Sequence, residues 1–427
     1  MDHRLKLLHR LARPAATKIV LLVLDGVGDL RTAEQPRTAL EKARLPNFDA
    51  LARRSCLGRL VPASTGITPG SGPGHLALFG YDPTLPETDI GRGVLEALGL
   101  GIDVRPGDVA ARGNFATAGA DGRLTDRRAG RIPTAECERL CAALNKSLVE
   151  QGLGGQGLGG QGLGGQGFDE QGLGVSAEVF PGEAYRFVLM LRGDDLHPGV
   201  ADTDPQKLGE LPLAAQAVDA AAETTAARVR AVVEVLEETI AAEPKANRVL
   251  LRGFSQTPSL PQLGDLYRLR CGAFAGYPLY RGVAGSCGME AVPCGKTFAE
   301  IVRVVEERWQ DFDYFFLHVK QTDQAGEDGN LDAKVAVLES VDADLPRLLE
   351  LEPDAIAVTG DHSTPTPMRA HSWHPVPLLL HSATCFVDDC RSFDESAAIH
   401  GAVGTIPARD LFGLLLAHAD RLRKFGA

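Results

Sequence analysis

Residues 18–25 read KIVLLVLD, a continuous apolar, β-branched run that ends in an aspartate. A run of this kind is typical of a strand that is covered on both faces of a parallel sheet. Residues 313–319 (DYFFLHV) lead to Asp323 in the same way, and residues 354–358 (DAIAV) lead to Asp361. Ligands of open α/β sheets bind beyond the carboxyl ends of the strands, so these three acids predict one composite site. For any single strand, the alternative is an acid that caps the following helix.

Long amphipathic stretches alternate with these strands and predict helices near 212–243, 297–311, 331–351 and 408–425. The fold class is therefore α/β, with a mostly parallel sheet flanked by helices. Between the acid-tipped strands the pattern changes to arginine-rich turns, a strand candidate at 184–191 and an alanine-rich helix. We expect a discontinuous main domain, 1–84 with 286–427, and a smaller inserted α/β domain at 85–285 that contains a flexible glycine-rich repeat at 151–174.

The composition narrows the classes of partner. The 427 residues carry 44 lysines and arginines against 56 aspartates and glutamates, and the net charge of −12 disfavours general binding to nucleic acids or anionic membranes. The eight cysteines form no CxxC pair, as expected of reduced cytosolic thiols. The longest early apolar run, Ile19 to Leu24, is too short for a membrane span. We expect a cytoplasmic protein that acts on a small molecule.

Residues 66–83, GITPGSGPGHLALFGYDP, contain a candidate nucleophile. Ser71 follows a Pro-Gly turn and precedes an apolar helical pattern, which predicts a place at or next to a helix N-terminus. The free backbone N–H groups and the helix dipole there favour an alkoxide and an incoming phosphate. The alternative is an ordinary N-cap serine. His75, one helical turn later, either orients a substrate, supports the serine, or is a packed histidine.

Several side chains supply the hard oxygen and imidazole donors that suit Mn²⁺, Zn²⁺ or Mg²⁺. Two divalent metals held by such a set would lower the pKa of a serine hydroxyl and neutralise a phosphoryl group in transfer. The stretch GDHSTP at 360–365 is more specific than a lone Asp-His pair. The candidate donors are Asp25, Asp323, Asp361, His362 and His371.

Six segments between residues 21 and 377 belong together: LLVLDGVGD, PGSGPGHLALFGYDP, DRRAGRI, HVKQTDQAGEDG, VTGDHSTP and AHSWHPVP. The pattern around them runs from about residue 18 to 415, without the glycine-rich repeat. Together they resemble the cofactor-independent phosphoglycerate mutases of the archaeal-type branch, within the alkaline phosphatase superfamily. The resemblance implies an alkaline-phosphatase-like domain interrupted by a smaller phosphotransferase domain. It also implies interconversion of 3-phosphoglycerate and 2-phosphoglycerate through a phosphoserine, without added bisphosphoglycerate.

By this resemblance Ser71 is the catalytic nucleophile. One metal would be held by Asp25, Ser71, Asp361 and His362, and the other by Asp323, His371 and one further residue. Where the family has Ala-Gly-His-Asp-Gly, this chain has a glutamate, Glu327, in place of the histidine.

Asp323 and Glu327 are four residues apart, so on a helix they share a face and Glu327 can serve as the third ligand. The extra carboxylate should move the preference from Zn²⁺ towards Mn²⁺ or Mg²⁺. The alternative is a solvated Glu327 and a weakened second site. His374 is a spare imidazole for which we expect a surface or supporting role.

Phosphate and carboxylate groups are bound best by guanidinium forks. The DRRAGRI segment of the insert supplies Arg127, Arg128 and Arg131, which match the family pattern and are expected to bind substrate, although a solvated basic turn is the alternative. Further candidate substrate cations follow apolar runs elsewhere in the chain: Arg252, Arg281 and Lys320.

Three rival functions stay open at this point. If water took the phosphoryl group from the enzyme, the same residues would make a phosphatase. Some archaeal-type relatives have been proposed as homoserine kinases, and the chain has no GxxxxGK[ST] phosphate loop, which argues against one kinase class only. Glu327 also admits a catalytically weakened binding protein, although so many donors in one site argue against that reading.

Overall fold

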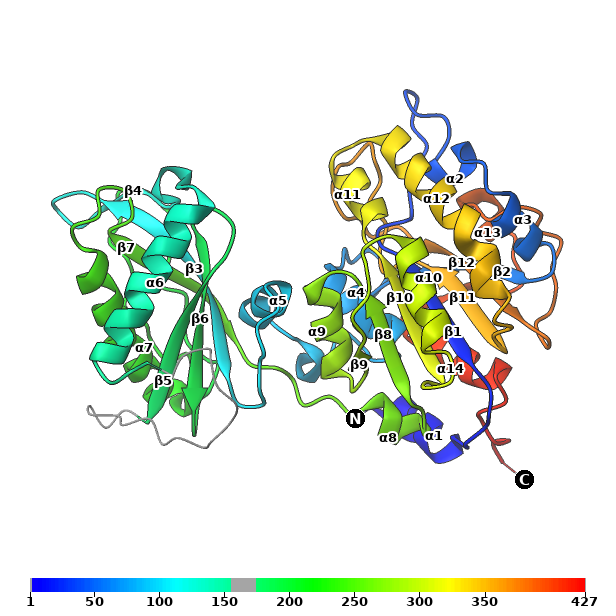
Figure 1. The fold of residues 1–427 in the computed structure, drawn as a ribbon, viewed down its shortest axis with the longest axis horizontal. Coiled ribbons are helices and arrows are strands. Elements are labelled where there is room, and N and C mark those ends of the chain that lie inside the picture. The colour runs from blue at the N-terminus through cyan, green and yellow to red at the C-terminus, as the bar shows by residue number, and fades with distance from the viewer. Residues whose placement is uncertain (1, 155–173, 427) are drawn as a thin grey trace. The chain divides into compact units, whose positions relative to one another are not determined.

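The computed structural model describes residues 2–154 and 174–426, and the chain divides into two compact units. The first unit joins residues 1–89 to 259–427, and the second is residues 90–258 (Figure 1). The insertion expected at 85–285 therefore ends earlier than the sequence interpretation placed it. The cause is strand β8 (Cys271–Ala275), which pairs with β10 (Tyr314–Val319) in the large sheet but does not end in an acid. Most of the repeat at 151–174 lies outside the described residues.

Within the described residues, eight strands form the sheet of the first unit, in the order β13-β2-β12-β11-β1-β10-β8-β9. Only β12 opposes the common direction, because it is antiparallel to both neighbours. The predicted α/β class with a mostly parallel sheet is confirmed. The strands not yet bounded are β1 (Ile19–Leu24), β2 (Cys56–Val61), β9 (Glu290–Ala291), β11 (Ala355–Thr359), β12 (Val376–Ser382) and β13 (Gly404–Pro407).

Helices cover both faces of this sheet (Figure 1). They are α1 (His3–Leu11), α2 (Ala39–Lys42), α3 (Pro46–Ala52), α4 (Ser71–Leu78), α8 (Leu263–Tyr267), α9 (Pro278–Ser286), α10 (Phe298–Glu307), α11 (Gln321–Glu327), α12 (Leu331–Leu349), α13 (Glu395–Ala398) and α14 (Leu411–His418). Short 3₁₀ turns lie at Pro86–Thr88 and Ala408–Asp410.

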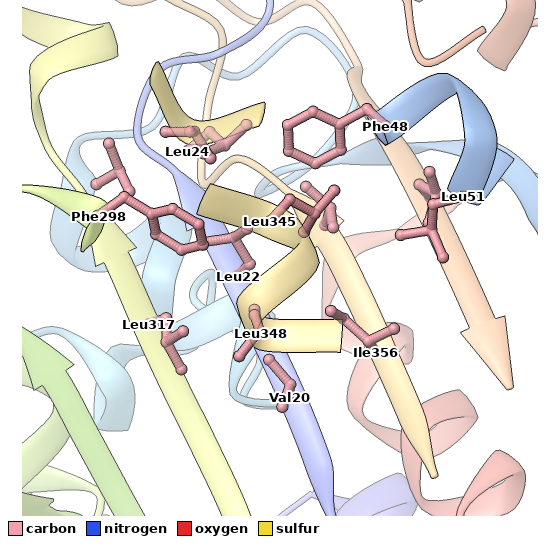
Figure 2. Packing of buried hydrophobic residues seen from close by; sticks show 14 of the residues in the cluster. Val20, Leu22, Leu24, Phe48, Leu51, Phe298, Leu317, Leu345, Leu348 and Ile356 are labelled. Atoms are coloured by element: carbon pink, nitrogen blue, oxygen red, sulfur yellow. The ribbon is translucent and has the colours of Figure 1, made fainter. Parts of the chain in front are cut away.

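Strand β1 lies inside the sheet between β10 and β11, and all six of its residues are buried. Its alternate side chains point to opposite faces. On one face Val20 and Leu22 belong to a core shared with Phe298 of α10 and Leu345 of α12 (Figure 2). Burial on both faces explains the continuous apolar run in the sequence. The first polar side chain after this strand is Asp25, at its carboxyl end.

The second unit has an antiparallel sheet with the order β4-β3-β6-β5, and β7 also pairs with β3. Helices α6 and α7 pack against each other and against this sheet, and they bury a core of their own. The elements are α5 (Arg92–Gly99), β3 (Val109–Ala118), β4 (Leu124–Asp126), α6 (Thr134–Glu150), β5 (Val175–Pro181), β6 (Arg186–Gly193), α7 (Glu223–Ile240) and β7 (Arg248–Ser255), with 3₁₀ turns at Ala129–Arg131 and Ala220–Ala222.

Two of the helices expected from the sequence are shorter in the structure. The helix expected at 212–243 begins only at Glu223, because the Asp219 side chain caps a 3₁₀ turn just before it, accepting a hydrogen bond from Ala222 N. The helix expected at 408–425 ends at His418, and Asp420 then takes a left-handed conformation with φ of 54°. No helix in the described part of the chain is long and apolar enough to cross a membrane.

Candidate metal centre

The carboxyl ends of three neighbouring strands carry the predicted acids. Asp25 follows β1 directly, and Asp361 follows β11 after Gly360. Asp323 lies in the short helix α11, which begins just after β10. Because β10, β1 and β11 are adjacent and parallel, the fold brings the three carboxylates to one edge of the sheet.

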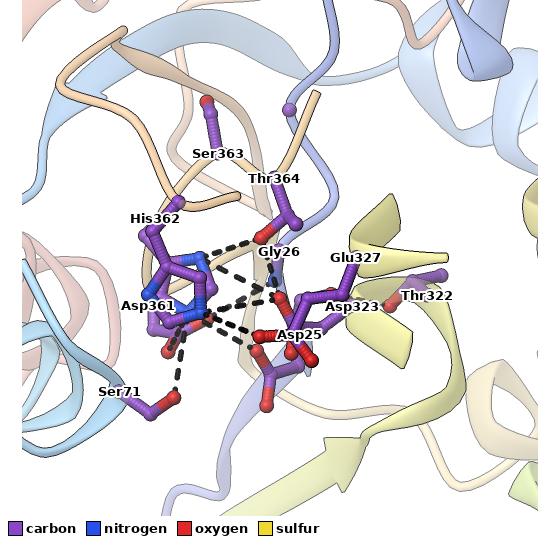
Figure 3. Close-up of polar contacts among 12 residues, drawn as sticks. Asp25, Gly26, Ser71, Thr322, Asp323, Glu327, Asp361, His362, Ser363 and Thr364 are labelled. Carbon is purple, nitrogen blue, oxygen red and sulfur yellow. Dashed lines mark hydrogen bonds and ion pairs between the residues drawn. The ribbon is translucent and has the colours of Figure 1, made fainter. Parts of the chain in front are cut away.

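Asp25, Asp361 and His362 form a fully buried group whose ligand atoms all lie within 4.8 Å of one another. His362 Nε2 is 3.4 Å from Asp25 Oδ1 and 3.2 Å from Asp361 Oδ2. Ser71 Oγ lies 3.4 Å from the same nitrogen (Figure 3). Two carboxylates, an imidazole and a hydroxyl thus converge, which is a donor set suited to a divalent cation. We call Asp25, Asp361 and His362 the buried group.

Two oxygens of the buried group need a positive partner. Asp25 Oδ1 and Asp361 Oδ2 are buried, and in the described part of the chain neither accepts a hydrogen bond of good geometry. Their nearest charged or chargeable neighbours are imidazoles, with His362 Nε2 3.4 Å from Asp25 Oδ1 and His75 Nδ1 3.2 Å from Asp361 Oδ2. An anionic oxygen that is buried without a donor or a cation is costly. A divalent metal would satisfy both atoms, so the residues present fit such an ion.

A second group, Asp323, His362 and His371, shares His362 with the first. Asp323 Oδ1 is 3.5 Å from His371 Nε2, and Glu327 Oε1 is 3.7 Å from that same nitrogen. Both acids lie on α11, and Figure 3 shows their side chains on the side of the helix that faces His362. The side chain of His371 is 21% exposed and that of Glu327 is 53% exposed, so solvent reaches this side of the centre. We call Asp323, His371 and Glu327 the open group.

Ser71 is the first residue of α4, and the N-cap position is taken by Gly70, which has no side chain to cap the helix. Its hydroxyl is directed to His362 instead of serving as the N-cap. The free N–H groups of the first helical turn and the positive end of the dipole lie beside it. The helix approaches the centre closely at Gly74, where a Cβ atom would lie 2.4 Å from the backbone oxygen of Asp361.

Sequence reasoning missed several side chains that orient the acids. His318 Nε2 lies 3.0 Å from Asp25 Oδ2, and Thr322 Oγ1 donates to the backbone oxygen of Asp25 at 2.5 Å. Thr364 Oγ1 donates to Asp323 Oδ1 at 2.5 Å. A signal for His318 was present, because it is the only polar side chain within the buried strand YFFLHV apart from the terminal tyrosine. The two threonines gave no signal that separates them from ordinary loop residues.

For His75, a candidate substrate residue by sequence, the structure shows contacts with the serine and an acid. His75 is only 1% exposed, and its Nδ1 lies 2.7 Å from the backbone oxygen of Ser71 and 3.2 Å from Asp361 Oδ2. Both of these atoms are acceptors, so Nδ1 carries the proton. These contacts favour a histidine that supports the serine and the acid. Support of the serine is one of the three readings that the sequence left open.

The charges around Asp25 favour its ionised form. Burial opposes ionisation, but the hydrogen bond with His318 and the charge of Lys320 hold the pKa of Asp25 well below its usual range. Lys320 Nζ is 3.3 Å from Asp25 Oδ2 and 2.5 Å from Asp323 Oδ2. Burial lowers the pKa of Lys320, but these two carboxylates outweigh it and raise the pKa above its usual value. Lys320 is thus a cation held between the two acids.

The candidate substrate cations of the second unit differ in their partners. Arg127 donates to both oxygens of the buried Asp204, at 2.9 and 2.5 Å, and Arg252 Nη1 lies 3.8 Å from the same carboxylate. Arg128 and Arg131 lie exposed on the turn that follows β4. Two of the four arginines are therefore fixed in position by an acid, and two are open to solvent.

Two other candidates lie in the first unit. Arg281 lies on α9 and donates to the backbone oxygen of Ala275 at 3.4 Å. His374 Nδ1 is 3.0 Å from Ser372 Oγ, and its ring stacks on Trp373. Among the described residues, neither of the two donor groups includes His374.

Comparisons with known proteins show the family to which the chain belongs. Residues 17–417 match the family described as the metalloenzyme superfamily. A protein of Thermus thermophilus, named "Probable 2,3-bisphosphoglycerate-independent phosphoglycerate mutase", is 45% identical over 425 residues, with 98% of each chain covered. A protein of Thermotoga neapolitana with the same name is 44% identical, with 99% of each chain covered.

Two solved structures share the fold over nearly the whole chain. A protein from Pyrococcus horikoshii has a TM-score of 0.75 at 27% identity and covers 96% of this chain and 99% of its own. A cofactor-independent phosphoglycerate mutase from Thermoplasma acidophilum has a TM-score of 0.72 at 27% identity and covers 94% of this chain and 100% of its own. The metalloenzyme family and the two donor groups together support the use of a divalent metal. As its motifs implied, the chain belongs to the 2,3-bisphosphoglycerate-independent phosphoglycerate mutases of the metalloenzyme superfamily.

Proposed function

We propose that this protein interconverts 3-phosphoglycerate and 2-phosphoglycerate in the cytoplasm, as a 2,3-bisphosphoglycerate-independent phosphoglycerate mutase of glycolysis and gluconeogenesis. The observation that carries the proposal is the position of Ser71. Its hydroxyl lies 3.4 Å from His362 Nε2, at the N-terminus of α4 and beside two buried acids. A serine oxygen in that place is set up as a nucleophile towards a phosphoryl group. The identity of the substrate is inferred from membership of the family.

Two divalent cations are proposed for the centre. One would be held by Asp25, Ser71, Asp361 and His362, and the other by Asp323, Glu327 and His371. When bound, such ions lower the pKa of a ligating serine hydroxyl and neutralise the charge of a transferring phosphoryl group. The donors are rich in carboxylates, which favours Mn²⁺, with Mg²⁺ or Zn²⁺ as the alternatives.

The proposed reaction is a double displacement at phosphorus. Ser71 Oγ attacks the phosphoryl group of 3-phosphoglycerate as the bond from phosphorus to the C3 oxygen breaks, and that oxygen takes up the proton that the serine loses. The products are phosphoserine and glycerate. The C2 hydroxyl of the retained glycerate then attacks the phosphoserine, which frees Ser71 and gives 2-phosphoglycerate. Exclusion of water in the interval separates this reaction from phosphate hydrolysis.

The chain's cations are proposed to hold the anionic substrate. Lys320, placed between Asp25 and Asp323, is positioned for the phosphoryl oxygens. For the carboxylate and hydroxyl groups of glycerate we propose guanidinium contacts, since these give bidentate hydrogen bonds. The residues proposed for this role are Arg127, Arg128, Arg131, Arg252 and Arg281.

A time course tests the proposal directly. The purified protein is incubated with 3-phosphoglycerate and Mn²⁺, without bisphosphoglycerate, and phosphorus NMR resolves 2-phosphoglycerate from free phosphate. We expect 2-phosphoglycerate to accumulate to an equilibrium mixture, with no release of phosphate. A parallel sample treated with a chelator should show no reaction, and activity should return when the metal is restored.

The other outcomes would reject the proposal in distinct ways. Free phosphate alone would identify a phosphatase that fails to retain glycerate. No reaction at any metal concentration would move the assignment to another phosphorylated substrate or to a binding protein. Consumption of a nucleoside triphosphate with homoserine as acceptor would identify the kinase alternative.

A further inference from the structure

A lysine that the proposed reaction does not use lies behind the metal centre. Lys334 is in the first turn of α12, and its side chain is fully buried. Its ammonium group donates hydrogen bonds to three backbone oxygens: Gly26 O at 2.8 Å, Gly28 O at 3.2 Å and Thr364 O at 2.9 Å. An ammonium group has three donors, so every one of them is used.

The three oxygens belong to the two loops that carry the buried group. Gly26 and Gly28 lie in the loop that begins with Asp25, and Thr364 lies two residues after His362. Figure 3 shows Thr364 and Gly26 close to each other, between His362 and Asp323. The bonds of Lys334 therefore join the end of strand β1 to the end of strand β11.

These two loops are packed without spare room. A Cβ atom at Gly26 would lie 2.4 Å from Thr364 Oγ1, and a Cβ atom at Gly28 would lie 2.0 Å from Ser363 Oγ. Thr364 N donates to the oxygens of both glycines, each at 3.2 Å. The lysine supplies the second donor to each of these oxygens. A shift of one loop would thus break several bonds together.

The side chain of Thr364 connects the two packed loops to the metal-ligand side chains. Its hydroxyl donates to Asp323 Oδ1 at 2.5 Å and lies 3.0 Å from His362 Nδ1. One residue that Lys334 holds by its backbone therefore touches a donor of each group. Fixed partners of this kind orient metal ligands and raise the affinity for the metal.

A buried ammonium group is costly unless it is fully hydrogen-bonded and close to anions. Burial lowers the pKa of Lys334, while the carboxylates of Asp29 and Glu395 oppose that shift. An apolar side chain would fill the same space on α12 without this cost. The retained charge and the three directed bonds suggest a requirement other than packing.

We propose that Lys334 is a positioning residue of the metal centre: its ammonium group ties the Asp25 loop to the Asp361–His362 loop and holds their carboxylates in metal-binding geometry. This inference rests on the proposed metal centre. A positioning role and a purely electrostatic role predict opposite changes in metal affinity when Lys334 loses its charge. A nearby positive charge repels a divalent cation, so its removal would tighten metal binding if charge were all that mattered.

The test is calorimetric titration of the metal-free protein with MnCl₂, together with the melting temperature of each metal-free variant. Lys334→Met removes the charge and the three bonds, and its manganese dissociation constant should rise about 10- to 100-fold, as for loss of a partner that orients ligands. The matched control is Leu338→Ala, one turn further along the same buried face of α12. It should lower the melting temperature but change the dissociation constant by less than about threefold, because its apolar side chain donates no hydrogen bond to the two loops.

Lys334→Gln is titrated in the same way, so that the inference can still be tested if the methionine variant does not fold. Its amide retains two of the donors, so we expect an affinity between those of the wild type and the methionine variant. Unchanged or tighter manganese binding in both lysine variants, with a loss of stability like that of Leu338→Ala, would overturn the inference. A wild-type protein that binds no manganese would overturn the metal centre itself, which is a different result.

Discussion

The two halves of the metal centre differ in how the protein holds them. The buried group, Asp25, Asp361 and His362, is enclosed, and the buried imidazoles of His318 and His75 lie 3.0 and 3.2 Å from its two acids. The open group has a half-exposed member, Glu327, whose side chain is 53% exposed. Positions that are enclosed on every side tolerate little change, whereas an exposed ligand can be exchanged for another. Glu327, which stands where the family pattern has a histidine, belongs to this exposed side of the centre.

The difference also assigns separate tasks to the two halves. Ser71 contacts the buried group through His362, so the proposed nucleophile belongs to the enclosed half. Asp323 connects the halves, because it is buried yet lies within 3.5 Å of His371. We therefore expect chemistry to depend most on the buried group, and metal preference to depend on the open group.

Ser71→Ala gives the largest expected effect. Loss of the nucleophile should lower turnover at least about a thousandfold, as for other enzymes that form a covalent intermediate. The rate of 2-phosphoglycerate formation is followed by phosphorus NMR, and the melting temperature checks the fold. Ser71→Thr is a control that keeps a hydroxyl at the same place. Substantial mutase activity in the alanine variant would show that the enclosed half does not contain the nucleophile.

The comparison between the halves is tested by substituting one acid from each. Asp361→Asn should weaken manganese binding at least about 100-fold, because the enclosed site offers no replacement donor. Glu327→Gln should weaken it by less than about tenfold, since an exposed charge contributes about 1 kcal/mol or less. Both dissociation constants are measured by calorimetry on metal-free protein. Equal losses would remove the distinction between the two halves.

Glu327→His restores the residue type that the family pattern has at this position. An imidazole in place of a carboxylate softens the open group, so the ratio of zinc to manganese affinity should rise by about tenfold. Competition titrations with both metals measure this ratio in the wild type and the variant. Gln324→His, an exposed position on the same helix, controls for a histidine added near the site. An unchanged ratio in Glu327→His would mean that Glu327 is not a ligand.

Much of the buried group could be predicted from the sequence. The runs that end in Asp25 and Asp361 are continuous and apolar because their strands are covered on both faces, and parallel neighbours place their ends together. Position 71 was also predictable, because a helical pattern begins there. These features are local in the chain, and regular geometry converts them into a site.

The supporting residues could not be predicted in the same way. Lys334 reaches residues about 300 positions away in the chain, and a lysine in an amphipathic helix ordinarily indicates a solvated face. The role of His75 stayed open between substrate and serine, because its spacing from Ser71 does not say which face of α4 is covered. The boundary at 258 was missed because β8 is a short strand without an acid at its end. Each of these depends on packing between distant segments.

The smallest expected effect lies farthest from the metal ligands, in the polar network behind the Asp25 loop. The Glu395 carboxylate accepts hydrogen bonds from Thr38 Oγ1 at 2.6 Å and from Asp29 N at 3.0 Å. Burial raises the pKa of Glu395 from its usual 4.5 to about 7, and these hydrogen bonds oppose that rise only in part. The folded protein therefore retains a proton that the unfolded chain has lost between these pH values.

This linkage gives the sign of the pH dependence. Because the folded state binds more protons than the unfolded state between pH 4.5 and about 7, the contribution of Glu395 to stability falls as the pH rises through that window. Glu395→Gln cannot ionise, so the variant should lose less stability than the wild type between pH 5 and about 7.5, with the same metal affinity at each pH. Urea unfolding of both metal-free proteins across that range measures the difference. If the stability of both proteins changed with pH in the same way, Glu395 would be ionised in the folded protein. The low-polarity surroundings of the buried group would then not extend as far as α13.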